Sequence, residues 1–531
     1  MLSRVRSYLL HGIDALPCEV EVDIDDREMR AQTVVGLPDA AVKESLERVR
    51  ASLANSGFGW PAGKVLINLA PADVRKEGPV YDLPIAVALL VAQGVIPPAP
   101  GPARSGVSSP GHPGLDHRRY IIAGELALDG RVRAVKGAIA LADMARREGA
   151  LGVIVPAENA AEAAVVSGVG GGTGGGVGGG VEVIGVRTLA EVVGVMTGRV
   201  GAEPHPPTDV SGLLRDAAAP IDFAEIRGQE AVKRAVVIAA SGSHNILMLG
   251  PAGTGKTMVA KALPGVLPPL TPEEAIEVTR VYSAAGQLPG GCGLVTTRPV
   301  RTPHHTASPA AVVGGGVVPR PGEISLAHRG VLFLDEMPEF PREVLETLRQ
   351  PMEDHAVTIA RSHASVRFPA DFMLVAAMNP TPKGHLEAGE AGRRSMERYL
   401  SRLSGPLLDR IDIHVEAPAV PFKELASAPR GSGTAMMREA VLGARRRQAE
   451  RQGPALPNAR LSGKQLDAWA PLDDAARSLL GQALTEMGLS ARAYDKVRRV
   501  ARTIADLEGA SSVRVAHVAE AVQYRLLDRT V

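Results

Sequence analysis

The stretch that organises the chain spans residues 245–262 and reads NILMLGPAGTGKTMVAKA. An apolar run precedes a glycine-rich segment and a second apolar-rich run follows it, which predicts a strand, a loop and a helix. The spacing is that of a phosphate-binding loop, in which backbone N–H groups surround phosphate oxygens, a lysine reaches the β- and γ-phosphates and a hydroxyl binds Mg²⁺. The sequence therefore predicts a nucleoside triphosphate site. The predicted binding residues are Gly250, Pro251, Ala252, Gly253, Thr254, Gly255, Lys256 and Thr257.

Two further apolar runs end in polar residues that suit hydrolysis. One ends in Asp335 and Glu336, and the other ends in Asn379. We expect Asp335 to hold Mg²⁺ with Thr257, directly or through water, and Glu336 to orient or deprotonate the attacking water. The alternative is a strand end whose acidic side chains are only solvated. Because the phosphate-binding loop lies in the same chain, hydrolysis is the preferred interpretation.

Composition restricts the class of protein. The chain has 531 residues, enough for roughly three domains of about 150 residues. It has no apolar run of the ~20 residues that a membrane span needs and no convincing signal peptide, so we expect a cytoplasmic protein without a membrane partner. Its two cysteines, Cys18 and Cys292, are too few for a disulfide framework or a cysteine metal cluster. The net charge of +1 provides no global attraction to nucleic acid, so any DNA site must be local.

Changes in composition divide the chain into three parts. Together these parts predict an α/β protein. The N-terminal part has strand-like runs and helical patterns, which predict an α+β domain. The central part carries the nucleotide motifs and predicts a parallel sheet, and the last part has polar helical patterns that predict a small helical lid. The predicted divisions are residues 1–199 with low-complexity inserts near 97–116 and 167–180, a proline-rich linker at 200–220, the ATPase domain at 221–420 and the lid at 421–531.

The N-terminal part resembles the proteolytic domain of Lon-type proteases. The resemblance rests on PADVRKEGP at 71–79 and GELALDGRV at 124–132. It implies a serine nucleophile after the Gly-Pro pair and a lysine after the second motif. Here Val80 occupies the serine place and Ile139 the lysine place, and neither side chain can act as a nucleophile or a base. We therefore expect a Lon-like fold used for binding or assembly, and no protease activity.

Residues 222–418 resemble the magnesium-chelatase-like branch of AAA+ ATPases. Together with the Lon-like N-terminus and the helical C-terminus, the chain is similar to the YifB/ComM family over nearly its full length. The most specific motifs are PHHTAS at 303–308, PRPGEISLAH at 319–328 and YLSRLSGPLLDR at 399–410. The resemblance implies an ATP- and Mg²⁺-dependent ring, expected to be a hexamer. It further implies a DNA helicase or translocase that acts in branch migration during natural transformation or recombination.

The same resemblance assigns three more catalytic roles. Asn379 occupies the place called sensor 1, whose amide positions the attacking water. Arg410 is the candidate arginine finger, delivered to the nucleotide of a neighbouring subunit, where a planar cation neutralises charge that develops in phosphoryl transfer. The alternative for Arg410 is an ordinary surface pair with an aspartate. Arg492 fits the place called sensor 2, at the start of a helix expected to point back at the nucleotide.

DNA contacts are expected from a hairpin and from a long insert. Residues 356–368 alternate like a hairpin with charged residues at its turn, and the resemblance implies that this hairpin lines the channel. The insert at 290–320 supplies further arginines. The predicted DNA contacts are Arg361, His363, Arg301 and Arg320. The alternative is solvated or subunit-pairing arginines, since only 3% of residues are aromatic and base stacking is poorly supplied.

The sequence also bears on other metals and other functions. Thr381 and Lys383 stand where relatives carry cysteines, so zinc is not expected, and His304 with His305 is more typical of a polar scaffold or of nucleic-acid contacts than of a metal site. Two alternatives to a DNA motor stay open. One is a motor for metal insertion or protein remodelling, as in the chelatases, and the other is an ATP-dependent protease, which Val80 and Ile139 disfavour.

Overall fold

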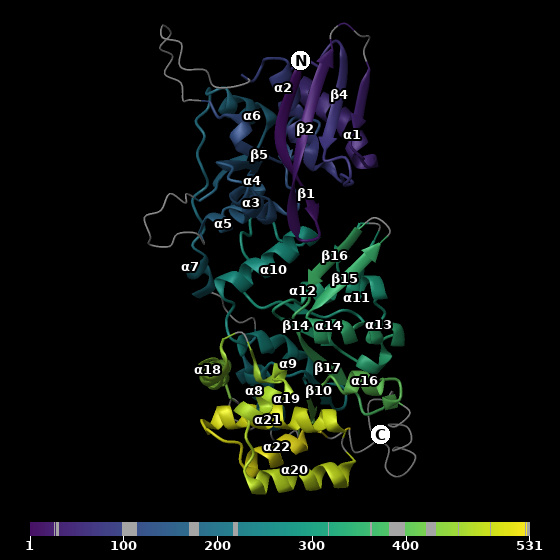
Figure 1. The fold of residues 1–531 in the computed structure, drawn as a ribbon, viewed down its shortest axis with the longest axis vertical. Coiled ribbons are helices and arrows are strands. Elements are labelled where there is room, and N and C mark those ends of the chain that lie inside the picture. Colours follow the sequence, from purple (N-terminus) through teal and green to yellow (C-terminus); the bar gives the residue numbers. More distant parts are fainter. Residues whose placement is uncertain are drawn as a thin grey trace. The chain divides into compact units, whose positions relative to one another are not determined.

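The computed structural model describes most of the chain, in two compact units. The first unit comprises Met1–Arg215 with Pro272–Val295, and the second comprises Asp216–Thr271 with Thr296–Val531. Figure 1 shows their elements. The described residues are 1–25, 27, 31–97, 114–168, 180–215, 221–316, 318–361, 364–381, 399–420, 432–454, 456–488, 490–525 and 527. Most of the two predicted inserts and the turn residue His363 lie outside this set.

The first unit is built on a seven-stranded mixed sheet. The two N-terminal strands form an antiparallel hairpin, and the strands from β5 onward are parallel. Inward side chains such as Val20 and Ile67 are fully buried, whereas Arg4 and Glu21 on the other face form an ion pair of 3.0 Å. This alternation matches a sheet with one face on the core. In spatial order the strands are β3 (Gln32–Val35), β4 (Lys64–Ala70), β2 (Asp14–Asp25), β1 (Leu2–His11), β5 (Tyr120–Ile122), β8 (Gly152–Pro156) and β9 (Glu182–Val186).

Helices complete the first unit. Every residue of α2 (Asp82–Ala92) is buried, as expected of a helix that is apolar all round. It packs against β1, β2 and α1. Within residues 1–215, the other described helices of at least seven residues are α1 (Ala40–Asn55), α3 (Ala138–Arg147), α4 (Ala157–Ala163) and α6 (Leu189–Met196).

One helix from within the predicted ATPase range belongs to the first unit. It is α10 (Pro272–Ala285), whose residues Val278 and Val281 are fully buried. Its Ser283 hydroxyl accepts a hydrogen bond of 2.8 Å from the backbone N–H of Gly137 and bonds the buried carboxyl of Glu162. The compact units therefore differ from the predicted domain boundaries. The chain passes from the second unit to the first after the phosphate-binding loop and returns to the second unit at Thr296.

A five-stranded sheet, parallel throughout, is the centre of the second unit. Its strands are almost wholly apolar because helices and loops cover both faces. All carboxyl ends therefore lie at one edge, which we call the carboxyl edge, and all amino ends lie at the opposite, amino edge. In spatial order the strands are β11 (Val300–Arg301), β14 (Val331–Leu334), β17 (Met373–Met378), β10 (Ile246–Leu249) and β18 (Ile413–Glu416).

Short helices and two small hairpins surround this sheet. The expected hairpin is confirmed, with Ala356 opposite Pro369 and Arg361 opposite Ala364. A second, smaller hairpin pairs Gly315 with Arg320. The hairpin strands are β15 (Ala356–Arg361), β16 (Ala364–Pro369), β12 (Gly314–Gly315) and β13 (Arg320–Pro321), and the helices are α8 (Glu230–Gly242), α9 (Lys256–Ala262), α11 (Pro309–Val313), α12 (Glu323–Leu326), α13 (Arg342–Thr347), α14 (Arg349–Asp354) and α16 (Gly405–Leu408).

The C-terminal part of the second unit is helical, as expected. Two of its helices, α18 and α21, pack against α8. Helix α21 begins at a serine cap, where the Ser490 hydroxyl accepts a hydrogen bond from the N–H of Ala493 at 3.2 Å. The helices are α18 (Thr434–Gln452), α19 (Gly463–Trp469), α20 (Asp474–Met487), α21 (Ala491–Glu508) and α22 (Val515–Gln523).

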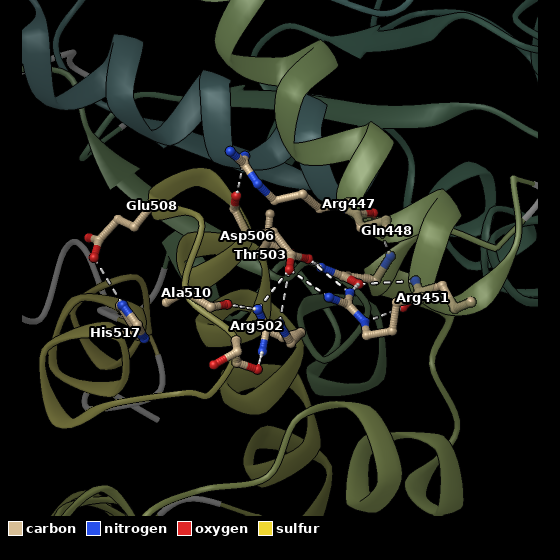
Figure 2. Close-up of polar contacts among 12 residues, drawn as sticks. Arg447, Gln448, Arg451, Arg502, Thr503, Asp506, Glu508, Ala510 and His517 are labelled. Atoms are coloured by element: carbon tan, nitrogen blue, oxygen red, sulfur yellow. Dashed lines mark hydrogen bonds and ion pairs between the residues drawn. The ribbon is translucent and has the colours of Figure 1, made fainter.

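A buried carboxylate joins these helices. Asp506 of α21, only 1% exposed, accepts hydrogen bonds of 2.6 and 2.9 Å from Arg451 of α18 and of 2.8 and 3.1 Å from Arg502 (Figure 2). Asn458 adds one of 2.8 Å, and Arg447 binds the backbone carbonyl of Asp506 at 2.9 Å. Because Arg451 and Arg447 of α18 both bond Asp506 of α21, these two helices are fixed to each other. We call these residues the Asp506 cluster.

Candidate nucleotide site

The phosphate-binding loop lies between β10 and α9, at the carboxyl edge. Gly253 and Gly255 have φ of 81° and 86°, a left-handed conformation that favours glycine. At Gly250 the reason for glycine is space, because a Cβ there would collide with the carbonyl oxygen of Ala417 after β18. The glycines thus allow the backbone to turn between strand and helix, a geometry in which N–H groups can surround a phosphate.

Lys256 is buried against this loop. Its ammonium donates hydrogen bonds of 2.7 Å to the carbonyl oxygens of Gly250 and Pro251, and one of 3.3 Å to the Asn379 side-chain oxygen. Burial lowers the pKa of Lys256, while the nearby carboxylates of Asp335 and Glu336 raise it. The ammonium is thus held where a phosphate oxygen could replace carbonyl oxygens, and Asn379 is directly beside it.

Thr257 and Asp335 lie together, as expected of two Mg²⁺ ligands. The Thr257 hydroxyl donates a hydrogen bond of 2.9 Å to one carboxylate oxygen of Asp335, and the backbone N–H of Glu336 donates to the other at 3.0 Å. Hydroxyl and carboxylate oxygens are the ligand chemistry that Mg²⁺ requires. The residues present therefore fit a nucleotide-bound Mg²⁺ ion held by Thr257 and Asp335.

Glu336 has an unusual backbone and a neighbour that sequence reasoning missed. Its φ of 50° and ψ of 47° place a non-glycine residue in the left-handed region, which is sparsely populated and typical of functional sites. The side chain is 48% exposed, and one carboxylate oxygen lies 3.7 Å from Nδ1 of His305. The sequence places His305 shortly after β11, but only the sheet order, which puts β11 beside β14, shows that it reaches Glu336.

Within the described part of the chain, the two histidines contact each other and Thr306. The His304 and His305 rings pack at 4.1 Å between centroids, and His304 bonds the Thr306 hydroxyl at 2.9 Å. Among the residues that the structure describes, no group of three His, Cys, Asp or Glu side chains could hold a metal ion.

The two candidate arginines lie away from the phosphate-binding loop of their own chain. Arg410 precedes β18, so its backbone is at the amino edge, whereas the loop is at the carboxyl edge. Its guanidinium donates to the Pro406 carbonyl oxygen at 2.6 Å and forms an ion pair with Glu353 of α14. Arg492 is 73% exposed and lies 3.8 Å from Asp409. Helix α21 thus begins beside the Arg410 segment.

The candidate DNA contacts are divided between exposed arginines and an arginine that is paired with a carboxylate. Arg361 is exposed at the end of β15, and its Nε donates to the Gly316 carbonyl oxygen at 3.3 Å. Arg320 is exposed on β13, opposite Gly315. These two arginines therefore lie on adjoining hairpins. Arg301, in contrast, binds Glu323 through two hydrogen bonds of 2.6 and 2.7 Å, so a phosphate would have to displace this carboxylate.

Comparisons with known proteins cover nearly the whole chain. Three family models match: subunit ChlI of Mg-chelatase at residues 20–159, magnesium chelatase subunit ChlI at 222–425, and the C-terminal part of that subunit at 431–525. The chain is 28% identical to the magnesium-chelatase 38 kDa subunit of Rhodobacter capsulatus, over 33% of this chain and 53% of the relative. None of the helices described is long and apolar enough to cross a membrane.

Two relatives match from end to end. The uncharacterized protein YifB of Salmonella typhimurium is 42% identical over 99% of this chain and 98% of its own length. The competence protein ComM of Haemophilus influenzae is 41% identical over the same shares. Together with the parallel sheet and the phosphate-binding loop, these matches support an ATPase. The chain belongs to the YifB/ComM family of magnesium-chelatase-like proteins.

Proposed function

We propose that this protein is an ATP-hydrolysing ring motor that acts on DNA, as a branch-migration helicase or translocase. The observation that carries the proposal is the meeting of four groups at the carboxyl edge. Lys256 reaches Asn379, Thr257 binds Asp335, and Glu336 follows directly on the same strand end. A cation, a divalent-metal ligand pair, a carboxylate and an amide are the parts that phosphoryl transfer to water requires.

Each residue of this site would have a separate role in ATP hydrolysis. Lys256 neutralises charge on the β- and γ-phosphates, and Mg²⁺, held by Thr257 and Asp335, supplies further charge neutralisation when it is bound with ATP. Glu336 orients or deprotonates the water, which Asn379 helps to position. His305, 3.7 Å from Glu336, influences where that carboxylate points.

The position of the two candidate arginines supports the proposal of a ring. Arg410 and Arg492 lie near the amino edge, where they are far from the phosphate-binding loop of their own chain. Both can therefore serve catalysis only at the nucleotide of another subunit, as an arginine finger supplied in trans does. Such a role is consistent with the proposed closed oligomer, a hexamer, in which Arg410 would exchange Glu353 for a phosphate.

DNA is proposed as the client because two exposed arginines lie on adjoining hairpins and because one full-length relative is named a competence protein. Arg361 and Arg320 would contact phosphates in the channel of the ring. The N-terminal unit is proposed to be a Lon-like domain without protease activity. Val80 and the fully buried Ile139 provide no nucleophile or base there.

A second candidate is a motor for metal insertion or protein remodelling. It is favoured by the chelatase family models, which match all three parts of the chain. The two candidates differ in client but share the hydrolysis site, so the choice between them depends on what stimulates ATP hydrolysis.

The deciding experiment is steady-state ATP hydrolysis by the purified full-length protein, alone and with single-stranded or four-way-junction DNA. Glu336→Gln is the inactive control. We expect stimulation by DNA that this variant abolishes, which would justify unwinding assays. A basal rate of ATP hydrolysis that neither DNA structure changes would contradict the DNA proposal and favour a protein or metallocofactor client.

A further inference from the structure

Asn245 links three segments of the second unit. It directly precedes β10, and its side-chain oxygen accepts a hydrogen bond of 2.8 Å from the N–H of Leu374 in β17. Its side-chain amide donates to the carbonyl oxygen of Arg410 at 3.1 Å, and its backbone N–H donates to the carboxylate of Asp412 at 3.1 Å. One residue thus fixes the Arg410 segment to the strands that end in the phosphate-binding loop and in Asn379.

Asp412 continues this linkage into the C-terminal helices. It is 6% exposed, and the ammonium of Lys496 in α21 lies 3.2 Å from its carboxylate. Burial would raise the pKa of Asp412, but Lys496 and His244 outweigh that effect and hold the pKa below its usual value. Lys496, 8% exposed, also donates to the Ile411 carbonyl oxygen at 3.2 Å. A buried ion pair therefore attaches α21 to Asp412, which lies two residues after Arg410 in the same segment that Asn245 holds.

These contacts are remote from the nucleotide. Asn245 precedes β10 and the phosphate-binding loop follows it, so the four residues of the strand, about 13 Å at ~3.3 Å per residue, separate them. Arg410 and Arg492 both lie on the Asn245 side of the sheet. The contacts of Asn245 and Asp412 consequently determine where the two arginines stand relative to the sheet, without touching the groups that bind ATP.

We propose that Asn245 and Asp412 are positioning residues for ATP hydrolysis in the neighbouring subunit. Asn245 holds the Arg410 backbone in place, and the Asp412–Lys496 pair connects α21 to that backbone, so that a shift of α21 moves Arg410. The inference rests on the proposed role of Arg410 in trans. A side chain that must meet a phosphate on another chain needs its backbone fixed, because small misplacements of a catalytic group cost large factors in rate.

The first measurement is the steady-state kinetics of Asn245→Ala in the full-length protein. We expect the kcat for ATP to fall by about 10- to 100-fold, with the KM for ATP within about twofold, because a group is misplaced and none that binds ATP is removed. Asn458→Ala is a matched control. It also removes a buried amide from the second unit, one bonded to Thr503 and Asp506, so its melting temperature should fall while its kcat is retained.

The decisive measurement mixes two impaired subunits. Asn245→Ala subunits retain Glu336 but misplace Arg410, and Glu336→Gln subunits bind ATP without hydrolysing it but present Arg410 correctly. We expect mixed oligomers to hydrolyse ATP several-fold faster than the sum of the separate proteins, because one kind of interface is complete. Activity equal to that sum would mean that Asn245 acts on its own nucleotide site or only on folding, and would overturn the proposal.

A positive control separates this outcome from failure of the proposed function. Arg410→Ala mixed with Glu336→Gln should show the same gain, and its absence would overturn the trans role of Arg410 and the present inference with it. If Asn245→Ala melts below the assay temperature, Asp412→Asn with Lys496→Met replaces it, since this double variant removes both buried charges together. The same gain on mixing is expected for the double variant, and no gain again contradicts the proposal.

Discussion

The nucleotide site and the Asp506 cluster both concentrate charge in the second unit, but they satisfy it differently. Asp506 is 1% exposed and accepts five side-chain hydrogen bonds from Arg451, Arg502 and Asn458. Glu336 is 48% exposed, and one of its carboxylate oxygens lies 3.7 Å from Nδ1 of His305. A fully bonded buried carboxylate holds helices together, whereas a loosely held one can turn toward a water molecule. Substitutions should therefore affect stability in one region and rate in the other.

The largest effect is expected at Glu336. Glu336→Gln keeps the size of the side chain but removes its basicity, so the kcat for ATP should fall by about 10²- to 10⁴-fold. Thermal melting should be unchanged, because the side chain is half exposed and has no short hydrogen bond among the described residues. Phosphate release and calorimetry on the same sample would check this. If the loss of unfolding free energy were as large as the rise in the activation free energy of hydrolysis, the two regions would not differ in what they control.

The opposite result is expected at Asp506. Asp506→Ala leaves Arg451 and Arg502 in a buried site without their shared carboxylate, which costs about 3–5 kcal/mol of unfolding free energy. Chemical denaturation of the full-length protein would measure it. Asp474→Ala is the matched control, since that aspartate is fully exposed on α20 and forms only a surface pair with Arg477. Equal unfolding free energies for the two variants would show that the cluster does not stabilise the helices.

A smaller effect is expected at the hairpin, where charge is exposed and poorly bonded. Arg361→Ala should weaken DNA binding and reduce the slope of log affinity against log salt concentration by about one unit, as loss of one phosphate contact does. Arg477→Ala removes the same charge from an exposed site on α20 and should leave the slope unchanged. Titrations at two salt concentrations decide the matter, and equal slopes for both variants would remove the hairpin from the DNA site.

The smallest effect concerns His414 of β18, a buried imidazole whose two ring nitrogens have no hydrogen-bond partner among the described residues. Burial, reinforced by the positive charges of Arg525 and Lys496 and opposed by Asp412, lowers its pKa. A histidine that stays neutral when folded loses stability as the pH falls below its unfolded pKa of about 6.5, because only the unfolded state takes up the proton. His414→Leu should therefore flatten the decline of unfolding free energy between about pH 6.5 and 5. An unchanged slope would assign the decline to other histidines.

The local motifs could be predicted because each is contiguous in the sequence. The glycines and Lys256 of the phosphate-binding loop, and the two carboxylates after β14, need only their own strand and turn to be recognised. Parallel strands then bring Thr257, Asp335, Glu336 and Asn379 to one edge without further information. The β15–β16 hairpin was predictable for the same reason, since its alternation and its turn are adjacent.

Tertiary structure decided what lies beside those motifs. His305 reaches Glu336 only because β11 is the neighbour of β14, and Asn245 reaches Arg410 only because β18 adds to the far side of β10. Helix α10 joins the first unit although its sequence lies within the ATPase range. Composition and periodicity reflect contacts between residues that are a few positions apart in the sequence. The contacts of His305, Asn245 and α10 join residues that are tens to hundreds of positions apart. The nucleotide motifs were thus determined by the sequence alone, whereas the groups that orient them depend on the order in which distant strands pair.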